Sequence, residues 1–252
     1  DWSSDVCSSD LPEVFVFSNE CFHKGVIAAV YSGKDLHVWS SYNLGWSPVG
    51  AEHVISETSS EYCAKTIDGK PAAEIYKKYL DVDLGSMFVA NTLEFPLIVN
   101  RYGEDVARSV IGCDKEGSMY FSADIRTGER FCLSFGSVRN ILSVTKKCAQ
   151  SLECFSPQGI ILIICANRMS YLGSDEQREI DYFNCFGADV SGACSFGEIT
   201  QINGNIAPMN CALVPFAFRE GDISDAEEAA YSGNETKKLG DDNDELIPLL
   251  DR

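Results

Sequence analysis

The feature that most constrains the fold is a short, unbroken apolar run in the second half of the chain. Residues 159–165 read Gly-Ile-Ile-Leu-Ile-Ile-Cys. A run of this length, bounded by turn-forming and polar residues, is typical of a β-strand buried on both faces. It is much too short to cross a membrane. Asn167 and Arg168 follow Cys165 closely, so we expect polar chemistry where this strand ends.

A carboxylate stands in a similar setting thirty residues later. Glu198 lies between Gly197 and Ile199 in a glycine-rich stretch. An arginine or glutamate beside buried strands is costly unless it is paired. We therefore expect Arg168 and Glu198 to line a ligand pocket at the strand ends, where open α/β sheets often bind ligands. The alternative is that the two side chains pair with each other and fix the strand register.

The chemistry of this pair indicates a ligand class. A guanidinium group holds a carboxylate through two parallel hydrogen bonds, and a glutamate is the natural partner of an ammonium group. Arg168 and Glu198 together would therefore suit a zwitterion such as an amino acid.

The order of the other elements predicts the fold class. Turn residues separate short β-prone runs, and apolar residues at helical spacing predict helices between them. The expected elements are β-rich blocks over 12–67 and 95–134, helices that begin at Pro71, after the N-cap Ser137 and at Ser174, and strands over 189–199 and 206–218. This order predicts an α+β fold with mixed, largely antiparallel sheets, helices packed on them, and two sub-domains.

Several short motifs occur in a definite order along the chain. They are Gly45–Gly50, read as a turn, the segment Asp68–Tyr76, Cys165-x-x-Arg168, Gly192-x-x-x-x-Gly197-Glu198-Ile199, and Met209-Asn210. In this order they resemble the FIST domain, a sensory module of prokaryotic signal-transduction proteins that is also found in some F-box proteins. The resemblance covers roughly residues 12 to 218.

The resemblance implies a domain organisation. Residues 12–67 would be the C-terminal part of the FIST N-terminal sub-domain, 68–218 the FIST C-terminal sub-domain, and 219–252 an acidic linker towards a missing output domain. We expect residues 1–11 to be an artefact, because they match the in-frame translation of a common sequencing-adapter oligonucleotide. We therefore expect a fragment that is truncated at both ends.

The resemblance also implies a function. A FIST domain would be the ligand-sensing part of a bacterial signal-transduction protein, for example in a two-component system. Small ligands such as amino acids have been proposed for the family, and the output domain is often a histidine kinase, a diguanylate cyclase or a chemotaxis transducer. The segment itself is not expected to be an enzyme.

Four further residues complete the expected ligand-binding set with Arg168 and Glu198: Cys165, Asn210, Gly197 and Arg108. Each has a structural alternative. Cys165 could be plain packing within the strand, and Asn210 could satisfy a loop backbone. Gly197 could allow close packing against a neighbouring strand, and Arg108 could reach solvent.

Cys165 also supports a second class of function. A cysteine hydrolase needs a base within hydrogen-bond reach of the thiol, and the chain offers His23, His37 and His53. A third class is a protein-interaction domain that binds no small ligand.

The composition excludes some partners. The chain has 38 acidic and 20 basic residues and a formal net charge of −18. Such an acidic chain is a poor candidate for binding nucleic acid or an anionic membrane. Its eleven cysteines form neither a C-x-x-C motif nor the Cys/His spacing of a zinc site. We therefore expect reduced thiols in the cytoplasm, with no metal and no cofactor.

Overall fold

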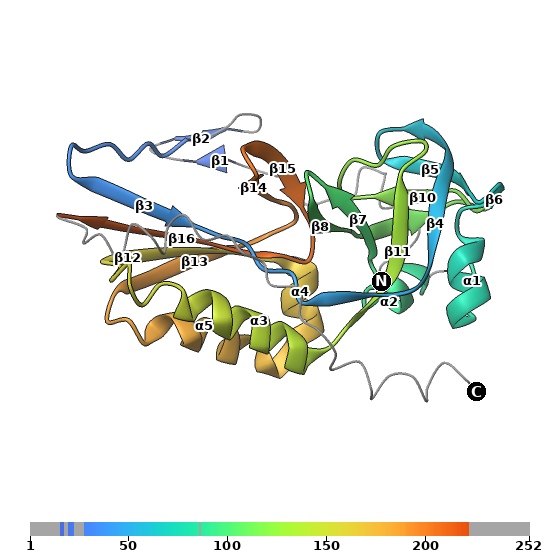
Figure 1. The fold of residues 1–252 in the computed structure, drawn as a ribbon. Coiled ribbons are helices and arrows are strands. Elements are labelled where there is room, and N and C mark those ends of the chain that lie inside the picture. The colour runs from blue at the N-terminus through green and yellow to red at the C-terminus, as the bar shows by residue number, and fades with distance from the viewer. Residues whose placement is uncertain (1–15, 18–19, 23–27, 86, 222–252) are drawn as a thin grey trace.

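Figure 1 shows the computed structural model of the chain, which describes residues 16–221 except 18–19, 23–27 and 86. Two large β-sheets lie side by side, and helices pack against each of them. Most neighbouring strands are antiparallel, so the predicted α+β class is confirmed. None of the helices that the structure describes combines the length and apolar character needed to span a bilayer.

The larger sheet has eight strands and is antiparallel throughout. Its order is β8-β7-β11-β4-β5-β10-β9, with β6 paired to β5. The strands are β4 (Trp46–Ser60), β5 (Cys63–Ile67), β6 (Lys70–Pro71), β7 (Leu97–Arg101), β8 (Glu104–Arg108), β9 (Val110–Cys113), β10 (Met119–Phe121) and β11 (Arg130–Gly136). The predicted turn at Gly45–Gly50 is wrong, because Trp46–Gly50 forms the first part of the long strand β4.

Two short helices bury their apolar faces against the larger sheet. They are α1 (Glu74–Leu80) and α2 (Phe88–Thr92). Tyr76 and Phe88 pack edge to face and join Leu97 and Phe131 in one core. The buried Tyr76 hydroxyl donates a hydrogen bond of 2.7 Å to the Phe95 carbonyl, so its polar end is satisfied.

The smaller sheet has the order β13-β12-β16-β3. Its strands are β3 (Leu36–Ser40), β12 (Gly159–Cys165), β13 (Asp189–Ser195) and β16 (Leu213–Glu220). The apolar run therefore forms strand β12 as predicted, parallel to β13 and antiparallel to β16. Both sheets combine strands from either side of residue 67, because β3 is an edge strand here while β4 and β5 belong to the larger sheet.

Helices cover one face of the smaller sheet (Figure 1). They are α3 (Val138–Gln150) and α5 (Glu176–Asn184). Ile160, Leu162 and Ile164 of β12 point to this side and join the core that includes Leu152 and Phe183. The alternate residues 161 and 163 are only partly buried, so β12 is less enclosed on its second face than the sequence predicted.

The segment after β12 differs most from the prediction. Helix α4 (Ala166–Leu172) begins directly after Cys165, so Arg168 lies in a helix and not at a strand end. A short 3-10 turn, η1 (Gly173–Asp175), then leads into α5, whose N-cap is Asp175 and not Ser174.

Both strands predicted after α5 are split. The stretch 189–199 divides into β13 and β14 (Glu198–Ile202), and the stretch 206–218 divides into β15 (Asn205–Met209) and β16. Strands β14 and β15 form a separate hairpin on the side of the smaller sheet opposite α3 and α5 (Figure 1). Its two-residue turn, Asn203–Gly204, has positive φ at both residues, as such tight hairpins require. Strands β1 (Val16–Phe17) and β2 (Cys21–Phe22) pair with each other.

Gly192 allows β13 to pack closely on β12. A Cβ atom at this position would lie 2.2 Å from the Leu162 carbonyl oxygen. At Gly197 a Cβ atom would meet nothing within 4 Å. We expect Gly192→Ala to lower the free energy of unfolding by about 1–1.5 kcal/mol, the lower part of the overpacking range, because the edge strand β13 can shift outwards.

Gly197→Ala is the matched control and should change stability by less than about 0.5 kcal/mol. Urea unfolding of both variants measures the difference. Equal effects of the two substitutions would contradict the close packing of β13 on β12.

Candidate functional site

Arg168 is completely buried, and its partner is Glu179 of helix α5. Arg168 Nε donates to both carboxylate oxygens at 3.0 Å, and Nη2 donates to Oε1 at 2.6 Å. Glu179 lies four residues before Phe183 and so shares the buried face of α5. The expected alternative in which Arg168 pairs with Glu198 is therefore wrong.

The other donors of Arg168 are also engaged. Nη2 donates to Asn43 Oδ1 at 2.6 Å and to Thr145 Oγ1 at 3.0 Å. Nη1 donates to the carbonyl oxygens of Asn43, Leu44 and Cys211. Arg168 thus joins α4, α3, α5 and the segment before β4. A ligand carboxylate would have to displace these partners, which weighs against the expected direct ligand contact.

Glu198 is the most unusual polar side chain in this region. It opens strand β14, pairs with Met209 in the hairpin, and is 1% exposed. Within the described residues neither carboxylate oxygen makes a hydrogen bond of good geometry, although the Ala212 N–H group and the Cys165 thiol lie near enough to affect its pKa. Burial, and then the neighbouring Cys165, raise the pKa of Glu198 to about 9. The Ala212 N–H group lowers this pKa, but its effect is smaller. Glu198 is therefore a buried neutral acid at pH 7.

Two buried thiols lie next to this carboxyl group. The Cys165 N–H donates to the Ala212 carbonyl at 3.0 Å, which extends the β12–β16 pairing by one residue and brings Cys165 beside Cys211. The contact from the Cys211 thiol, followed by backbone N–H groups including that of Arg168, lowers the pKa of Cys165 to about 6 although burial opposes this. The pKa of Cys211 is raised by the contact with Cys165 and by burial.

The structure thus brings Cys165 and Glu198 together but gives Arg168 a different role. Arg168 binds the Cys211 carbonyl, whereas Glu198 lies near the Cys211 thiol. Cys211 is not among the site residues expected from the sequence. Its positive φ of 56° is a conformation that side chains other than glycine seldom adopt, and it is not visible in the sequence.

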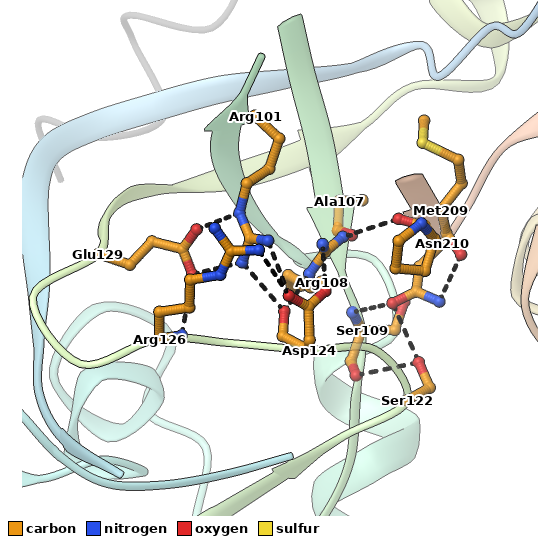
Figure 2. Close-up of polar contacts among 11 residues, drawn as sticks. Arg101, Ala107, Arg108, Ser109, Ser122, Asp124, Arg126, Glu129, Met209 and Asn210 are labelled. Atoms are coloured by element: carbon orange, nitrogen blue, oxygen red, sulfur yellow. Dashed lines mark hydrogen bonds and ion pairs between the residues drawn. The ribbon is translucent and has the colours of Figure 1, made fainter. Parts of the chain in front are cut away.

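Arg108 and Asn210 lie at the contact between the larger sheet and the hairpin (Figure 2). Arg108 is completely buried and donates to Asp124 and to the Pro208 carbonyl, so the alternative that it reaches solvent is wrong. Burial, and then Arg101, lower the pKa of Arg108 to about 10.

Asn210 has a full set of internal partners. Its Oδ1 accepts from the Ser109 N–H at 3.2 Å and from Ser122 Oγ at 3.0 Å, and its Nδ2 donates to the Met209 carbonyl at 2.8 Å. Figure 2 shows these bonds beside the Arg108 contacts. The geometry matches the structural alternative, in which Asn210 satisfies loop backbone groups.

Arg108 belongs to a charged network that the sequence reasoning missed. Asp124 accepts from Arg101 Nη1 at 2.8 Å and from Arg126 at 3.3 Å, and Glu129 binds Arg101 as well (Figure 2). The spacing Asp124-x-Arg126-x-x-Glu129 around one turn was the available signal. Arg101 also lines a surface cleft of about 630 Å³.

Neither of two surface clefts reaches the buried thiols. The cleft of about 630 Å³ is lined by residues of the larger sheet, and another of about 690 Å³ is lined by acidic residues such as Asp81 and Asp83. Gly197 lies in the exposed turn between β13 and β14, where the Ser195 hydroxyl bonds its backbone. Since nothing would contact a Cβ there, the packing alternative for Gly197 is wrong.

The histidines within the described ranges do not assist Cys165. His53 Nδ1 is 2.6 Å from Asp68 Oδ2 in the larger sheet, and His37 pairs with Arg219 at the edge of the smaller one. His23 lies outside the described residues. Because no described histidine lies beside Cys165 to act as its base, the geometry gives the hydrolase alternative no support. No cluster of three or more His, Cys, Asp or Glu side chains suited to a metal occurs in the part of the chain that the structure describes.

Comparison with known families adds the decisive observation. The model of the FIST C domain matches residues 72–201, and the model of the FIST N domain matches residues 6–70. The chain belongs to the FIST family. FIST domains are sensory modules of signal-transduction proteins, so the general role of this chain is sensing. Searches of curated proteins and of solved structures found no match.

The two FIST matches help to locate the site. The FIST C match includes Cys165, Arg168 and Glu198, whereas Asn210 and Cys211 follow it. The FIST N match contains β3, β4 and β5, which pair with strands from later in the chain. The FIST N match begins at residue 6, within the segment 1–11 that was expected to be an artefact, and residues 6–15 lie outside the described part.

Proposed function

We propose that this FIST chain senses a small ligand through Glu198, in the cytoplasm of a bacterium. The observation that carries the proposal is the buried carboxyl group with two unpartnered oxygens. A buried polar group without a partner costs about 1–3 kcal/mol, so a ligand that supplies the missing hydrogen bonds would be favoured. Polar groups left unsatisfied in a native fold often mark functional positions.

The chemistry of Glu198 indicates what the ligand carries. A neutral acid can donate one hydrogen bond and accept others, and a cationic ligand would instead draw off its proton. Amines, including the ammonium group of an amino acid, therefore fit this carboxyl group. The carboxylate of an amino acid would need other donors than Arg168, whose nitrogen atoms already bind Glu179 and neighbouring oxygens.

A route to Glu198 starts at the turn before it. Gly197 is exposed, and the space where its side chain would stand is empty. Opening this turn would admit a small ligand between β14 and Cys165. Among the described hydrogen bonds, Gly197 takes part only in those with Ser195, the last residue of β13, which pairs with Cys165 of β12.

The hairpin β14–β15 connects the site with both sheets. Asn210 and Arg108 tie its open end, where Glu198 pairs with Met209, to the larger sheet. Cys211 then leads into β16 of the smaller sheet. A ligand that binds one arrangement of the hairpin more tightly would shift the population towards it. In this proposal the shift is passed to a signalling output domain, such as a histidine kinase or a diguanylate cyclase.

Ligand binding can be tested with one substitution. A thermal-shift screen of amines and amino acids should raise the melting temperature of the wild-type chain, and a ligand at 100 times its Kd contributes about 2.7 kcal/mol. Glu198→Gln, which retains the shape but not the acid, should weaken binding of the hit at least about tenfold, as titration calorimetry would show.

The exposed Glu153→Gln provides the matched control and should bind the hit like the wild type. If Glu198→Gln also binds normally, Glu198 is not the site. If no amine or amino acid shifts the melting temperature, the proposed ligand class is wrong.

The hairpin also gives some support to the protein-interaction alternative. Phe196, Ile199 and Ile206 are 84%, 65% and 76% exposed on or beside it. Exposed apolar side chains gathered in one place often mark a contact surface. A domain of this class would show no ligand in the screen above, so the same experiment separates the two functions.

A further inference from the structure

Two thiols and one acid form a compact buried group at the end of strand β12. Cys165 is 3% exposed, Cys211 is fully buried and Glu198 is 1% exposed. The Cys165 N–H donates at 3.0 Å to the carbonyl oxygen of Ala212, the residue next to Cys211, and Glu198 pairs with Met209, two residues before Cys211. The pKa shifts of the three side chains have one another among their causes. Three separate segments therefore converge here: the end of β12, the start of β14 and the link between β15 and β16.

Cys165 has the features of a reactive thiol. It is the residue directly before α4, and the backbone N–H groups of Arg168 and Asn167 are among the groups that lower its pKa. Its lowered pKa favours the thiolate, which is the nucleophilic form of cysteine. Glu198 beside it retains its proton.

Cys211 is held in place as a second thiol. Its backbone has a φ of 56°, and its carbonyl oxygen accepts from Arg168 Nη1 at 3.0 Å. Its sulfur is 3.1 Å from Ser109 Oγ. A non-glycine residue in this conformation persists only when its surroundings fix it, and such residues cluster at functional sites.

We propose that Cys165 and Cys211 form a redox-active dithiol site that hydroperoxides oxidise to an intramolecular disulfide bond. This proposal shares with the proposed sensing function only the side chains of Cys165, Cys211 and Glu198. In this proposal the same side chains respond to a second kind of signal, a chemical oxidant, in addition to a bound amine.

The reaction balances with the groups present. The Cys165 thiolate attacks one oxygen of hydrogen peroxide, the O–O bond breaks, and the leaving hydroxide takes the proton of Glu198 to become water. Cys165 is now a sulfenic acid. The Cys211 thiol then attacks this sulfur, the S–O bond breaks, and the hydroxyl group leaves with the Cys211 proton as a second water. Two thiols are oxidised and one peroxide is reduced.

The experiment identifies which cysteines of the full chain become joined by a disulfide bond. The reduced protein is treated with an equimolar amount of hydrogen peroxide at pH 7, blocked with N-ethylmaleimide, digested without reductant and analysed by mass spectrometry. The expected product is a peptide pair joined through Cys165 and Cys211. The Cys165–Cys211 pair should be oxidised before exposed Cys154, because the lowered pKa of Cys165 favours its nucleophilic thiolate and its partner thiol is nearby.

Two variants separate the steps of this reaction. In Cys211→Ser the second thiol is absent, so a sulfenic acid should accumulate at Cys165 and be trapped by dimedone. In Glu198→Gln the proton donor is absent, so oxidation of Cys165 should slow at least about tenfold. Cys185→Ser, which removes an exposed thiol, is the control and should leave the Cys165–Cys211 product unchanged.

The proposal is overturned if Cys165 and Cys211 are both still labelled as free thiols when Cys154 is oxidised. It is also overturned if the disulfide forms only in urea-unfolded protein. Both measurements use the wild-type chain, so they do not depend on the folding of a variant. If the disulfide does not form but an amine still raises the melting temperature, the dithiol proposal is wrong and the ligand proposal stands. If the disulfide forms but no amine raises the melting temperature, only the dithiol proposal stands.

Discussion

Replacing Arg168 with alanine is expected to lower the free energy of unfolding by about 3–5 kcal/mol, because it leaves the carboxylate of Glu179 buried without its partner. Glu179 is 1% exposed and cannot recover the lost contact from water. Asn43 and the Cys211 carbonyl would lose hydrogen bonds as well. Urea unfolding followed by circular dichroism measures the change.

Arg178→Ala is a matched control on the neighbouring helix. Arg178 also pairs with a carboxylate, that of Asp175 at 2.6 Å, but its side chain is 62% exposed. Exposed ion pairs contribute little, so this variant should unfold almost like the wild type. If the two arginine variants were equally stable, Arg168 would not be the structural centre that its contacts indicate.

Glu198→Gln is expected to make the protein more stable at pH 7 by about 3 kcal/mol and to change the pH dependence of its stability. In the wild type, folding raises the pKa of Glu198 from 4.5 to about 9 and lowers that of Cys165 from 9.0 to about 6. A raised carboxyl pKa favours the folded state at low pH, and this stability is lost as the pH rises. A lowered thiol pKa acts in the opposite direction and favours the folded state at high pH.

The two effects can be combined along the pH scale. Between pH 4.5 and 6 the folded state holds one proton more than the unfolded state, so stability falls by about 1.4 kcal/mol per unit, or about 2 kcal/mol in all. Between pH 6 and 9 the folded chain carries its proton on Glu198 and the unfolded chain carries it on Cys165. The numbers of bound protons are then equal, and stability due to this pair is constant.

Unfolding in urea at pH 4.5, 6 and 7.5 tests the prediction. The difference between Glu198→Gln and the wild type should grow by about 1.4 kcal/mol per pH unit from pH 4.5 to pH 7.5, because both proteins contain Cys165 and only the wild type must keep a proton on Glu198. Glu153→Gln, with its exposed side chain, should follow the wild-type curve throughout. A difference that is the same at all three values would mean that Glu198 ionises in the folded state as it does in the unfolded chain.

Much of the local structure could be predicted because local physics decides it. The apolar run 159–165 forms strand β12, helical spacing places a helix after Ser137, and the ordered motifs identify the family. The split of 189–199 was not predictable from periodicity. Both halves are β-prone, and only the turn at Ser195–Gly197 sends them to different sheets.

The sequence predicted which residues belong to the candidate site, but it did not predict which of them contact each other. Arg168 and Glu198 were chosen because a buried charge needs compensation, and both are indeed buried. Their partners come from distant segments, Glu179 for the first and the two cysteines for the second. Composition and spacing contain no information about which distant groups meet.

The sequence alone therefore determined the fold class, the central strand, the family and the expectation that two costly polar side chains lie inside the protein. The tertiary structure decided that Arg168 is satisfied internally while Glu198 is not. The physical reason is that hydrogen bonding depends on distance and direction between atoms. Those quantities arise only when α5, the β14–β15 hairpin and the end of β12 are packed around Cys211.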